Sequence, residues 1–342
     1  MFDKDMLKSI LAAYGPSGRE QTVSDVIRSY VEPFADEVYN DTLGNLIAVK
    51  KGTSGKKVML SAHMDQIGLI VVDIDEKGFL RVSNVGGVNP VVSLAREVQF
   101  ENGTHGVTYF ETEKHGAKDA TMPELFVDIG ATTREEAEAK VQIGDVAVYV
   151  TNFVEMGSRV SSGALDDRIA CAAVVEAFRT MQNVHDVYAV FTVQEEVGLR
   201  GAKITAERLR PALAICLEGT PADDNFTAPD EAQGALKKGV QIRFRDGSMV
   251  AHPGLVAFAR RVAEENNIPH QCAVRTGGGT NGGSIHLAPG GVPTLVLGIP
   301  VRYAHTHYGY SAAADVDAAI ALACAILRAL TPDVLRLLNP MA

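Results

Sequence analysis

Acidic residues and histidines stand at several points where an apolar, strand-like run of the chain gives way to a loop. The adjacent pair Glu195 and Glu196 is the most informative of these points, because it follows the apolar run 187–193. In open α/β sheets, ligands bind beyond the carboxyl ends of the strands. Carboxylates and imidazoles gathered there suit a pair of divalent metal ions bridged by a carboxylate. The residues in such positions are His63, Asp166, Glu195, Glu196, Glu218 and His305.

The spacing of these residues bears on the mechanism. Asp65 lies two residues after His63, on the same side of an extended chain, where it can orient the imidazole. In a two-metal hydrolase, one of two neighbouring carboxylates binds metal while the other takes a proton from the attacking water. A glycosidase instead needs two carboxylates roughly 5–10 Å apart, on opposite sides of the scissile bond. Adjacent Glu195 and Glu196 therefore favour a metal-dependent hydrolase.

Other residues offer alternatives to this site. Any one of these acids or histidines, taken alone, is more often an ordinary polar group of the surface or core. His307 stands two residues after His305 and competes with it as a ligand. The glycines 277–279 resemble a phosphate-binding loop, but no lysine follows them, which favours a tight turn near the site. His252 and His286 lack acidic partners in a matching context, so we expect them to be structural.

The composition is that of an ordinary folded protein. Its 342 residues suffice for one large α/β domain with a smaller one, or for two equal domains. The net charge of −10 argues against nucleic acid or an anionic membrane as a partner. Four scattered cysteines without a CxxC pair indicate neither a zinc ribbon nor a disulfide framework. Residues 1–5 open an amphipathic helix, and no apolar run reaches the roughly 18 residues of a membrane span, so we expect a cytoplasmic protein.

The pattern of apolar, polar and glycine residues changes at two points along the chain. Glycine-punctuated, strand-like segments predominate between about residues 67 and 161, with a hairpin signal at 75–78. On either side, helical periodicity alternates with apolar runs typical of strands covered on both faces. Ser17 is the expected cap of the second helix. The expected strands are 38–39, 45–50, 57–62, 187–193, 213–217 and 294–298, and the expected helices are 3–14, 17–31, 133–139, 166–182, 250–265 and 311–330.

This pattern predicts an α/β sandwich domain with a mixed sheet, formed by residues 1–67 and 161–342. A β-rich domain, residues 68–160, interrupts it after the first strand that carries a candidate ligand.

Taken together, the motifs resemble those of the M42 family of co-catalytic metallo-aminopeptidases. Relatives include the tetrahedral (TET) aminopeptidases and proteins labelled glutamyl aminopeptidase or endoglucanase. The resemblance covers the whole chain. It rests on the segments His63 to Asp65, Ala164 to Arg168, Glu195 to Gly201, Gly278 to Thr280 and Arg302 to His305.

The resemblance implies a role for each matching residue. Asp166 matches the carboxylate that bridges two metals, His63 and Glu218 match ligands of one metal, Glu196 and His305 match ligands of the other, Glu195 matches the general base, and Asp65 matches the residue that orients His63. It also implies that the insert at about 68–160 is barrel-like and mediates dimerisation, and that dimers assemble into hollow dodecamers.

Three positions depart from the family pattern. The family usually has aspartate where Glu218 stands, and glutamate reaches a metal through a longer arm. Gln66 and Asn281 each stand where the family has an acid. We expect both changes to remove a negative charge near the cleft.

We therefore expect an aminopeptidase that hydrolyses the N-terminal bond of short peptides. The attacking water is activated by two divalent metal ions per subunit, Zn²⁺ or Co²⁺ with Mn²⁺ also accepted, and Glu195 is the base. Two alternatives stay open: another amide hydrolase on the same site, such as a deacylase, and a catalytically silent assembly subunit. Activity on N-acylated substrates would identify the first, and a metal-free, inert protein the second.

Overall fold

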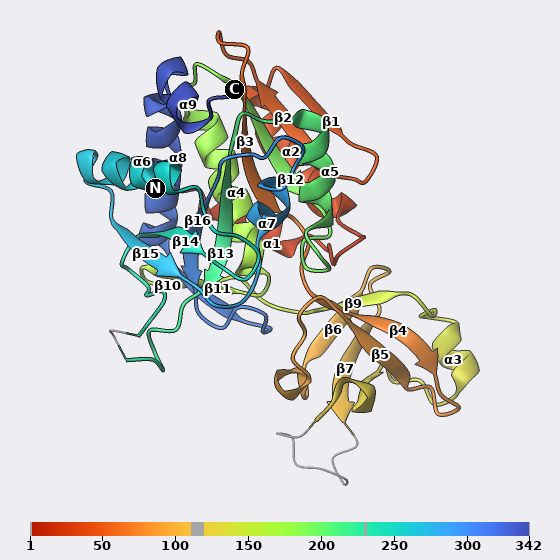
Figure 1. Cartoon of the computed structure of the whole chain (residues 1–342). Coiled ribbons are helices and arrows are strands. Elements are labelled where there is room, and N and C mark those ends of the chain that lie inside the picture. Colours follow the sequence, from red (N-terminus) through yellow and green to blue (C-terminus); the bar gives the residue numbers. More distant parts are fainter. Residues whose placement is uncertain (1, 111–119, 229–230, 342) are drawn as a thin grey trace.

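The computed structural model describes residues 2–110, 120–228 and 231–341, and it contains an α/β body and a smaller β-barrel (Figure 1). An eight-stranded mixed sheet forms the centre of the α/β body. Its strands, in spatial order, are β1 (Glu37–Asn40), β2 (Leu46–Lys50), β12 (Asp186–Thr192), β3 (Lys57–His63), β13 (Leu213–Pro221), β16 (Thr294–Val301), β14 (Val240–Arg245) and β15 (His270–Val274).

The middle strands β12, β3, β13 and β16 run parallel to one another, so their carboxyl ends lie at one edge of the sheet. All four are apolar and almost fully buried, because helices cover both faces. One face carries α1 (Lys4–Ala12), α2 (Gln21–Val31), α4 (Leu165–Thr180), α6 (Pro253–Glu265) and α8 (Ala313–Ala329), and the other carries α5 (Arg200–Leu209) and α7 (Asn281–Ile285) (Figure 1).

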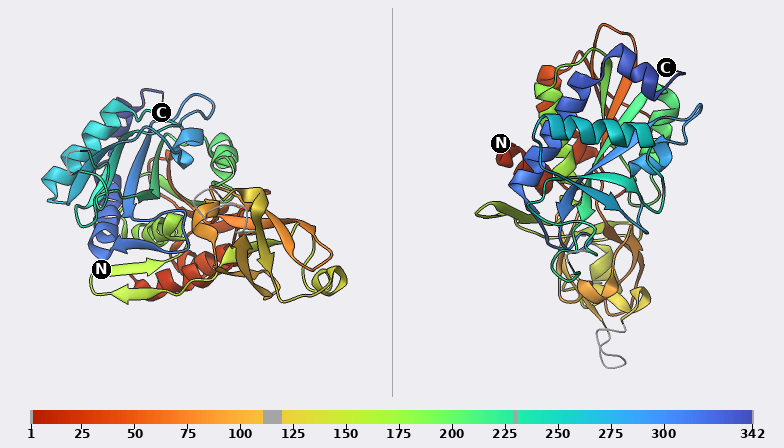
Figure 2. Two further views of the ribbon diagram at one scale, coloured as in Figure 1. Left: turned by 90° about the horizontal axis from the view of Figure 1, so that it is seen from below. Right: turned by 60° about the vertical axis from the view of Figure 1, so that its left-hand side comes forward.

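The barrel has a hydrophobic core of its own, separate from that of the α/β body. It protrudes from one end of that body in each view (Figure 2). The hairpin predicted at 75–78 is present, with Gly78 at a φ of 84°. The barrel consists of β4 (Gly68–Ile74), β5 (Leu80–Val85), β8 (Leu125–Asp128), β7 (His105–Phe110), β6 (Glu97–Phe100) and β9 (Val146–Tyr149), with α3 (Arg134–Glu138) outside.

A small three-stranded sheet carries the chain from the barrel back to the α/β body. Its strands are β10 (Val154–Met156), β11 (Arg159–Ser162) and β17 (Gly309–Ala312), followed by α8 and α9 (Pro332–Leu338). No single helix of the described residues is long and apolar enough to cross a membrane. Only α8 and α9 taken together, bent by 102°, reach the length and apolar composition of a span.

The eight-stranded mixed sheet and the closed barrel confirm the predicted fold class, a mixed-sheet α/β domain with a barrel.

One local expectation is wrong. Ser17 does not cap α2, which begins at Gln21 after an N-cap position occupied by Glu20, because the Ser17 hydroxyl donates to Asp65 instead. The helix predicted at 166–182 is present as α4, although its residues Asp166 and Asp167 have non-helical dihedral angles.

Candidate metal centre

The candidate ligands meet at the carboxyl-terminal edge of the central strands. His63 is the last residue of β3, where it lies opposite Thr192, the last residue of β12. Glu195 and Glu196 follow β12 directly, and Glu218 lies near the end of β13. Asp166 enters from the start of α4, and His305 enters from the loop after β16. The edge predicted from the apolar runs is therefore where these side chains gather.

The two imidazoles lie on either side of one carboxylate. His63 Nε2 is 3.3 Å from Asp166 Oδ1, and His305 Nε2 is 3.3 Å from Asp166 Oδ2. Asp166 therefore presents one oxygen to each histidine, an arrangement that would allow this carboxylate to lie between two cations.

Further carboxylates complete each half of the cluster. His63 Nε2 lies 3.6 Å from Glu218 Oε1 and 3.8 Å from Glu195 Oε2, while His305 Nε2 lies 3.4 Å from Glu196 Oε2. Among the described residues, two groups place one ligand atom per residue within 4.8 Å of one another, enough to hold a metal ion. These groups are His63 with Glu195 and Glu218, and His63 with Asp166 and Glu196.

The electrostatics of the cluster are those of a site that lacks positive charge. Burial raises the pKa of Glu196 to about 8, and burial with the charge of Glu218 raises the pKa of Glu195 well above its usual value. The Asp166 carboxylate raises the pKa of His305 to about 10 against the effect of burial. The raised pKa values mean that these groups retain protons, which supply positive charge to the acidic cluster. Divalent metal ions would supply the same charge, so a cluster of this kind favours their binding.

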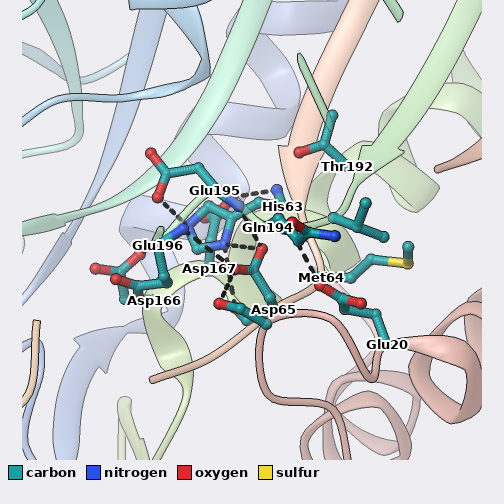
Figure 3. Close-up of polar contacts among 12 residues, drawn as sticks. Glu20, His63, Met64, Asp65, Asp166, Asp167, Thr192, Gln194, Glu195 and Glu196 are labelled. Carbon is teal, nitrogen blue, oxygen red and sulfur yellow. Dashed lines mark hydrogen bonds and ion pairs between the residues drawn. The ribbon is translucent and has the colours of Figure 1, made fainter. Parts of the chain in front are cut away.

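Asp65 holds both halves of the site (Figure 3). Its carboxylate accepts hydrogen bonds from the backbone N–H groups of Glu195, at 3.0 Å, and Glu196, at 3.1 Å. It also accepts from the Ser17 hydroxyl at 2.6 Å, and it lies 3.4 Å from His63 Nδ1. The spacing in the sequence predicted that Asp65 lies beside His63. It did not predict that Asp65 also accepts hydrogen bonds from the backbone of the two glutamates.

Glu20 also supports the loop that carries Glu195 and Glu196, although it is not a candidate ligand itself. It is 5% exposed, and its Oε1 accepts from the backbone N–H of Gln194 at 2.9 Å (Figure 3). The same oxygen accepts from the backbone N–H of Gly18 at 2.8 Å. Gln194 directly precedes Glu195, the candidate base. Its φ is 55°, a left-handed backbone conformation that is uncommon for residues other than glycine. The sequence carried no signal for this role.

Asp167 and Arg168 anchor the start of α4. Asp167 accepts hydrogen bonds from the backbone N–H of His63, at 2.9 Å, and of Gly219, at 2.7 Å, so it ties β3 to β13. The fully buried Arg168 donates to backbone carbonyls of residues 10, 11, 13, 15 and 64. Sequence reasoning missed both roles, since their partners lie far away in the chain.

A segment beside the barrel reaches the cluster. A side chain on Gly87 would place its Cβ 2.5 Å from His305 Nδ1, so only glycine fits this approach. The Gly87 backbone also contributes to the raised pKa of His305. The loop after β5 therefore contributes to the position of one candidate ligand.

The alternative histidines have other partners. His252 accepts the Leu255 N–H at the start of α6, and His286 Nδ1 lies 2.9 Å from the Gly282 carbonyl, in keeping with structural roles. His307 packs edge-on against the Tyr308 ring, and its Nδ1 is buried without a hydrogen-bond partner. Of His305 and His307, only His305 has ion pairs with the candidate acids among the described residues, at 3.3 Å from Asp166 and 3.4 Å from Glu196. Asn281 is fully buried behind the strands, where it donates to Ser61 and Thr192, so it does not line the cleft.

A cavity of about 650 Å³ opens onto the cluster. This volume lies within the usual range of about 300–1,000 Å³ for ligand pockets. Its lining includes Asp166, the two adjacent glutamates, Glu218 and His305, and also Arg243, Arg275 and the loop 276–280. The glycines 277–279 thus line the cavity as part of a loop.

The comparisons with known proteins agree with this arrangement. The family model described as M42 glutamyl aminopeptidase matches residues 44–322. A putative aminopeptidase of Acetivibrio thermocellus is 42% identical, over 93% of this chain and 96% of its own length. The lysyl aminopeptidase of Pyrococcus furiosus is 36% identical, over 97% of this chain and 99% of its own.

Solved structures give the same result. The TET aminopeptidase of a marine-sediment archaeon of the Thaumarchaeota has a TM-score of 0.94 and 34% identity, with 98% of both chains covered. The TET1 peptidase of Pyrococcus horikoshii, which assembles into a tetrahedron or a large octahedral shell, has a TM-score of 0.85 and 30% identity, covering 95% of this chain and 98% of its own. The chain therefore belongs to the M42 family of aminopeptidases.

Proposed function

We propose that this aminopeptidase hydrolyses the N-terminal peptide bond of short peptides with the help of two divalent metal ions. The observation that carries the proposal is the Asp166 carboxylate, which lies between two imidazoles at 3.3 Å from each. Asp166 Oδ1 and Glu218 Oε2 are also buried without a hydrogen-bond partner. Buried acceptors of this kind are costly unless a ligand satisfies them.

The donor set fits hard or borderline divalent ions. Asp166 would bridge the two ions, His63 and Glu218 would hold one, and Glu196 and His305 would hold the other. Zn²⁺ competes strongly for such ligands, and an oxygen-rich site also accepts Co²⁺ or Mn²⁺. When bound, ions of this type polarise the scissile carbonyl and acidify the attacking water.

The protein supplies the proton transfers. In our proposal, Glu195 accepts the proton of the attacking water and then delivers it to the departing amine. The Glu195 residue is 8% exposed and lines the cavity, and its Oε2 is 3.8 Å from His63 Nε2. Asp65 fixes the backbone of Glu195, so the base is held in place before substrate arrives.

We also propose that the chain works as an assembly in the cytoplasm. The TET1 relative forms closed shells, and the β-rich insert, residues 68–160, is the element that we assign to dimerisation. All four cysteines are free, as expected for a reducing compartment.

Two matched substitutions test the assignment of the adjacent glutamates. Glu195→Gln should keep two metal ions per chain but lower kcat by about 10²–10⁴-fold, because the amide does not accept the proton. Glu196→Gln should lose or weaken one metal ion, and excess metal should restore part of the activity. The measurements are metal content by mass spectrometry and kcat on aminoacyl-p-nitroanilides.

Each outcome has a definite meaning. Metal loss in Glu195→Gln with two ions retained in Glu196→Gln would reverse the two roles. Unchanged rate and metal content in both variants would overturn the site. Hydrolysis of N-acylated substrates but not of free-amine substrates would identify a deacylase instead.

A further inference from the structure

The two candidate histidines differ in how their rings are held. The side chain of His63 is 1% exposed, whereas that of His305 is 41% exposed. Asp65 lies 3.4 Å from His63 Nδ1, but no carboxylate of the described residues lies within 4.0 Å of His305 Nδ1. A second partner of this kind normally fixes the ring of a metal-binding histidine. The orientation of His305 therefore depends on the backbone of its loop, residues 302–308, and on the close approach of Gly87.

This loop, which we call the His305 loop, has an uncommon backbone conformation. Tyr303 has a φ of 60° and His305 a φ of 59°, both in the left-handed region. Residues other than glycine enter this region at a cost, so they remain there only where the surrounding structure holds them. Within the loop, the backbone N–H and the hydroxyl of Thr306 both donate to the Tyr303 carbonyl. These bonds close the turn but do not attach it to the rest of the protein.

The segment that follows β13 provides such an attachment. β13 and β16 pair in parallel as far as Pro221 and Val301, and the backbone N–H of Ala222 donates to the Val301 carbonyl at 2.8 Å. Side chains then continue the pairing. Arg302 donates from Nε to Asp224 Oδ1 at 2.8 Å and from Nη2 to Asp224 Oδ2 at 2.7 Å. A guanidinium and a carboxylate joined by two such bonds form a strong contact with a specific geometry.

The next residue of the same segment holds the next residue of the loop. Asn225 Nδ2 donates to the Tyr303 hydroxyl at 2.9 Å. The Tyr303 ring also packs between the rings of Phe226 and Tyr310, with centroids 6.5 Å and 5.8 Å away. The segment after β13 is therefore bonded to two consecutive residues of the His305 loop, and the second of them lies two positions before the candidate ligand.

The residues that make these bonds lie outside the candidate site. Within the part of the chain that the structure describes, Asp224, Asn225 and Arg302 do not line the 650 Å³ cavity. They are also absent from the lining of a second, small cavity beside Asp166 and His305. Substituting them would therefore affect a metal ion only through the His305 loop, and not by contact with the ion or the substrate.

We propose that Asp224, Asn225 and Arg302 are positioning residues, which hold the His305 loop so that His305 binds its metal ion. The inference rests on the proposed function, because it takes His305 to be a ligand. Loss of the groups that orient a metal ligand typically weakens metal binding by about 10–100-fold. Breaking the Asp224–Arg302 pair should therefore weaken the ion that His305 shares with Glu196. The other ion is held from the central strands and should be unaffected.

Asp224→Asn is the main variant, because it keeps the shape of the side chain but removes the charge that Arg302 binds. In calorimetric titration of the metal-free protein with Co²⁺, the Kd of one ion should rise by about 10–100-fold, and the Kd of the other should not change. Arg302→Lys keeps the positive charge but lacks the planar fork, so it should show the same selective defect. Asp75→Asn breaks an ion pair of similar exposure in the barrel, with Arg81 at 3.0 Å, and is the matched control.

Double variants identify the ion that is affected. Glu196→Gln weakens the same ion in our proposal, so adding Asp224→Asn to it should cause little further loss of metal. Adding Asp224→Asn to Glu218→Gln should instead leave neither ion tightly bound. Selective weakening of the other ion, equal weakening of both, or wild-type affinity for both ions in Asp224→Asn and Arg302→Lys would overturn the inference.

Kinetics separate a metal defect from a general loss of structure. With excess metal, kcat of Asp224→Asn on leucyl-p-nitroanilide should return towards the wild-type value. KM should stay unchanged throughout, because the substituted residue does not line the cavity. A lasting rise of KM at saturating metal would contradict a role that acts through the metal ligand alone.

Hydrogen exchange of the metal-free protein gives a result that does not depend on activity. Peptides that cover residues 302–308 should exchange faster in Asp224→Asn and in Asn225→Ala than in the wild type, and at the wild-type rate in Asp75→Asn. Unchanged exchange in the first two variants would overturn the inference. If the wild type binds no metal ion, the proposed function fails, and hydrogen exchange alone decides whether these residues hold the loop.

Discussion

The Glu20 carboxyl group makes a quantitative prediction possible, because it is buried outside the ligand cluster. Burial, together with the charge of Asp65, raises its pKa from 4.5 to about 7, against the opposing effect of the N–H groups of Gly18 and Gln194. A carboxyl group whose pKa is higher in the folded state binds its proton more tightly there than in the unfolded chain. Folding stability is therefore lost as pH rises from about 4.5 through about 7.

Replacing Glu20 with glutamine should remove this loss. Each pKa unit corresponds to about 1.4 kcal/mol, so the rise from 4.5 to about 7 corresponds to about 3 kcal/mol of unfolding free energy. Glu20→Gln keeps an acceptor oxygen for the Gln194 and Gly18 N–H groups but carries no charge. At pH 8 the variant should be more stable than the wild type by up to about 3 kcal/mol, and near pH 4 this advantage should vanish.

The assay is thermal unfolding between pH 4 and 9 at fixed metal concentration, with Glu32→Gln as an exposed control. The Tm difference between Glu20→Gln and the wild type should grow by a few degrees across this range. Equal pH dependence in all three proteins would refute the reasoning. Glu20→Ala, which also removes the acceptor for Gln194, should in addition lower kcat, since the backbone before Glu195 loses its support.

Three further predictions concern the metal ions, the support of Asp65 and the assembly. Verified removal of metal by a strong chelator should abolish activity and lower Tm, because a metal that binds only the folded state stabilises it by mass action; unchanged values would count against a metal site. Ser17→Ala removes one of the hydrogen bonds to Asp65 and should cost about 1–2 kcal/mol in chemical denaturation, with metal content retained; loss of both metal ions would contradict a purely supporting role. Light scattering after size exclusion should show a species far larger than the 36.5 kDa chain, and a monodisperse active monomer would exclude assembly as a requirement.

The sequence predicts the central sheet and the positions of the candidate ligands for one physical reason. Strands buried on both faces must be continuously apolar, so β12, β13 and β16 are visible as runs, and a charged residue at the end of a run marks the edge of the sheet. Parallel pairing then brings these ends together without further information. Two strands of this sheet escaped prediction, because neither has a continuous apolar run. In β14 a glutamine and two arginines alternate with the apolar residues, and the residues of the edge strand β15 are largely exposed.

The support of the site is not visible in the sequence, because its partners are backbone groups far away in the chain. Glu20 and Gln194 are 174 residues apart, and Asp167 and His63 are 104 residues apart. Every residue offers a backbone N–H, so the sequence does not show which one a buried carboxylate will accept. Asn281 illustrates the same limit, since its place behind the strands follows from tertiary packing alone.

The hydrogen bonds that the carboxylate oxygens accept distinguish the acids that support the site from those that would bind metal. Asp65 and Asp167 are completely buried, and both oxygens of each accept N–H or O–H groups of the protein, so they have little left to offer a cation. Asp166 and Glu218 instead each keep a buried oxygen that accepts no hydrogen bond. Asp166 and Asp167 are adjacent and identical in type, and only their hydrogen bonds distinguish them. The unsatisfied neighbour is the one that lies between the two histidines, as a bridging ligand must.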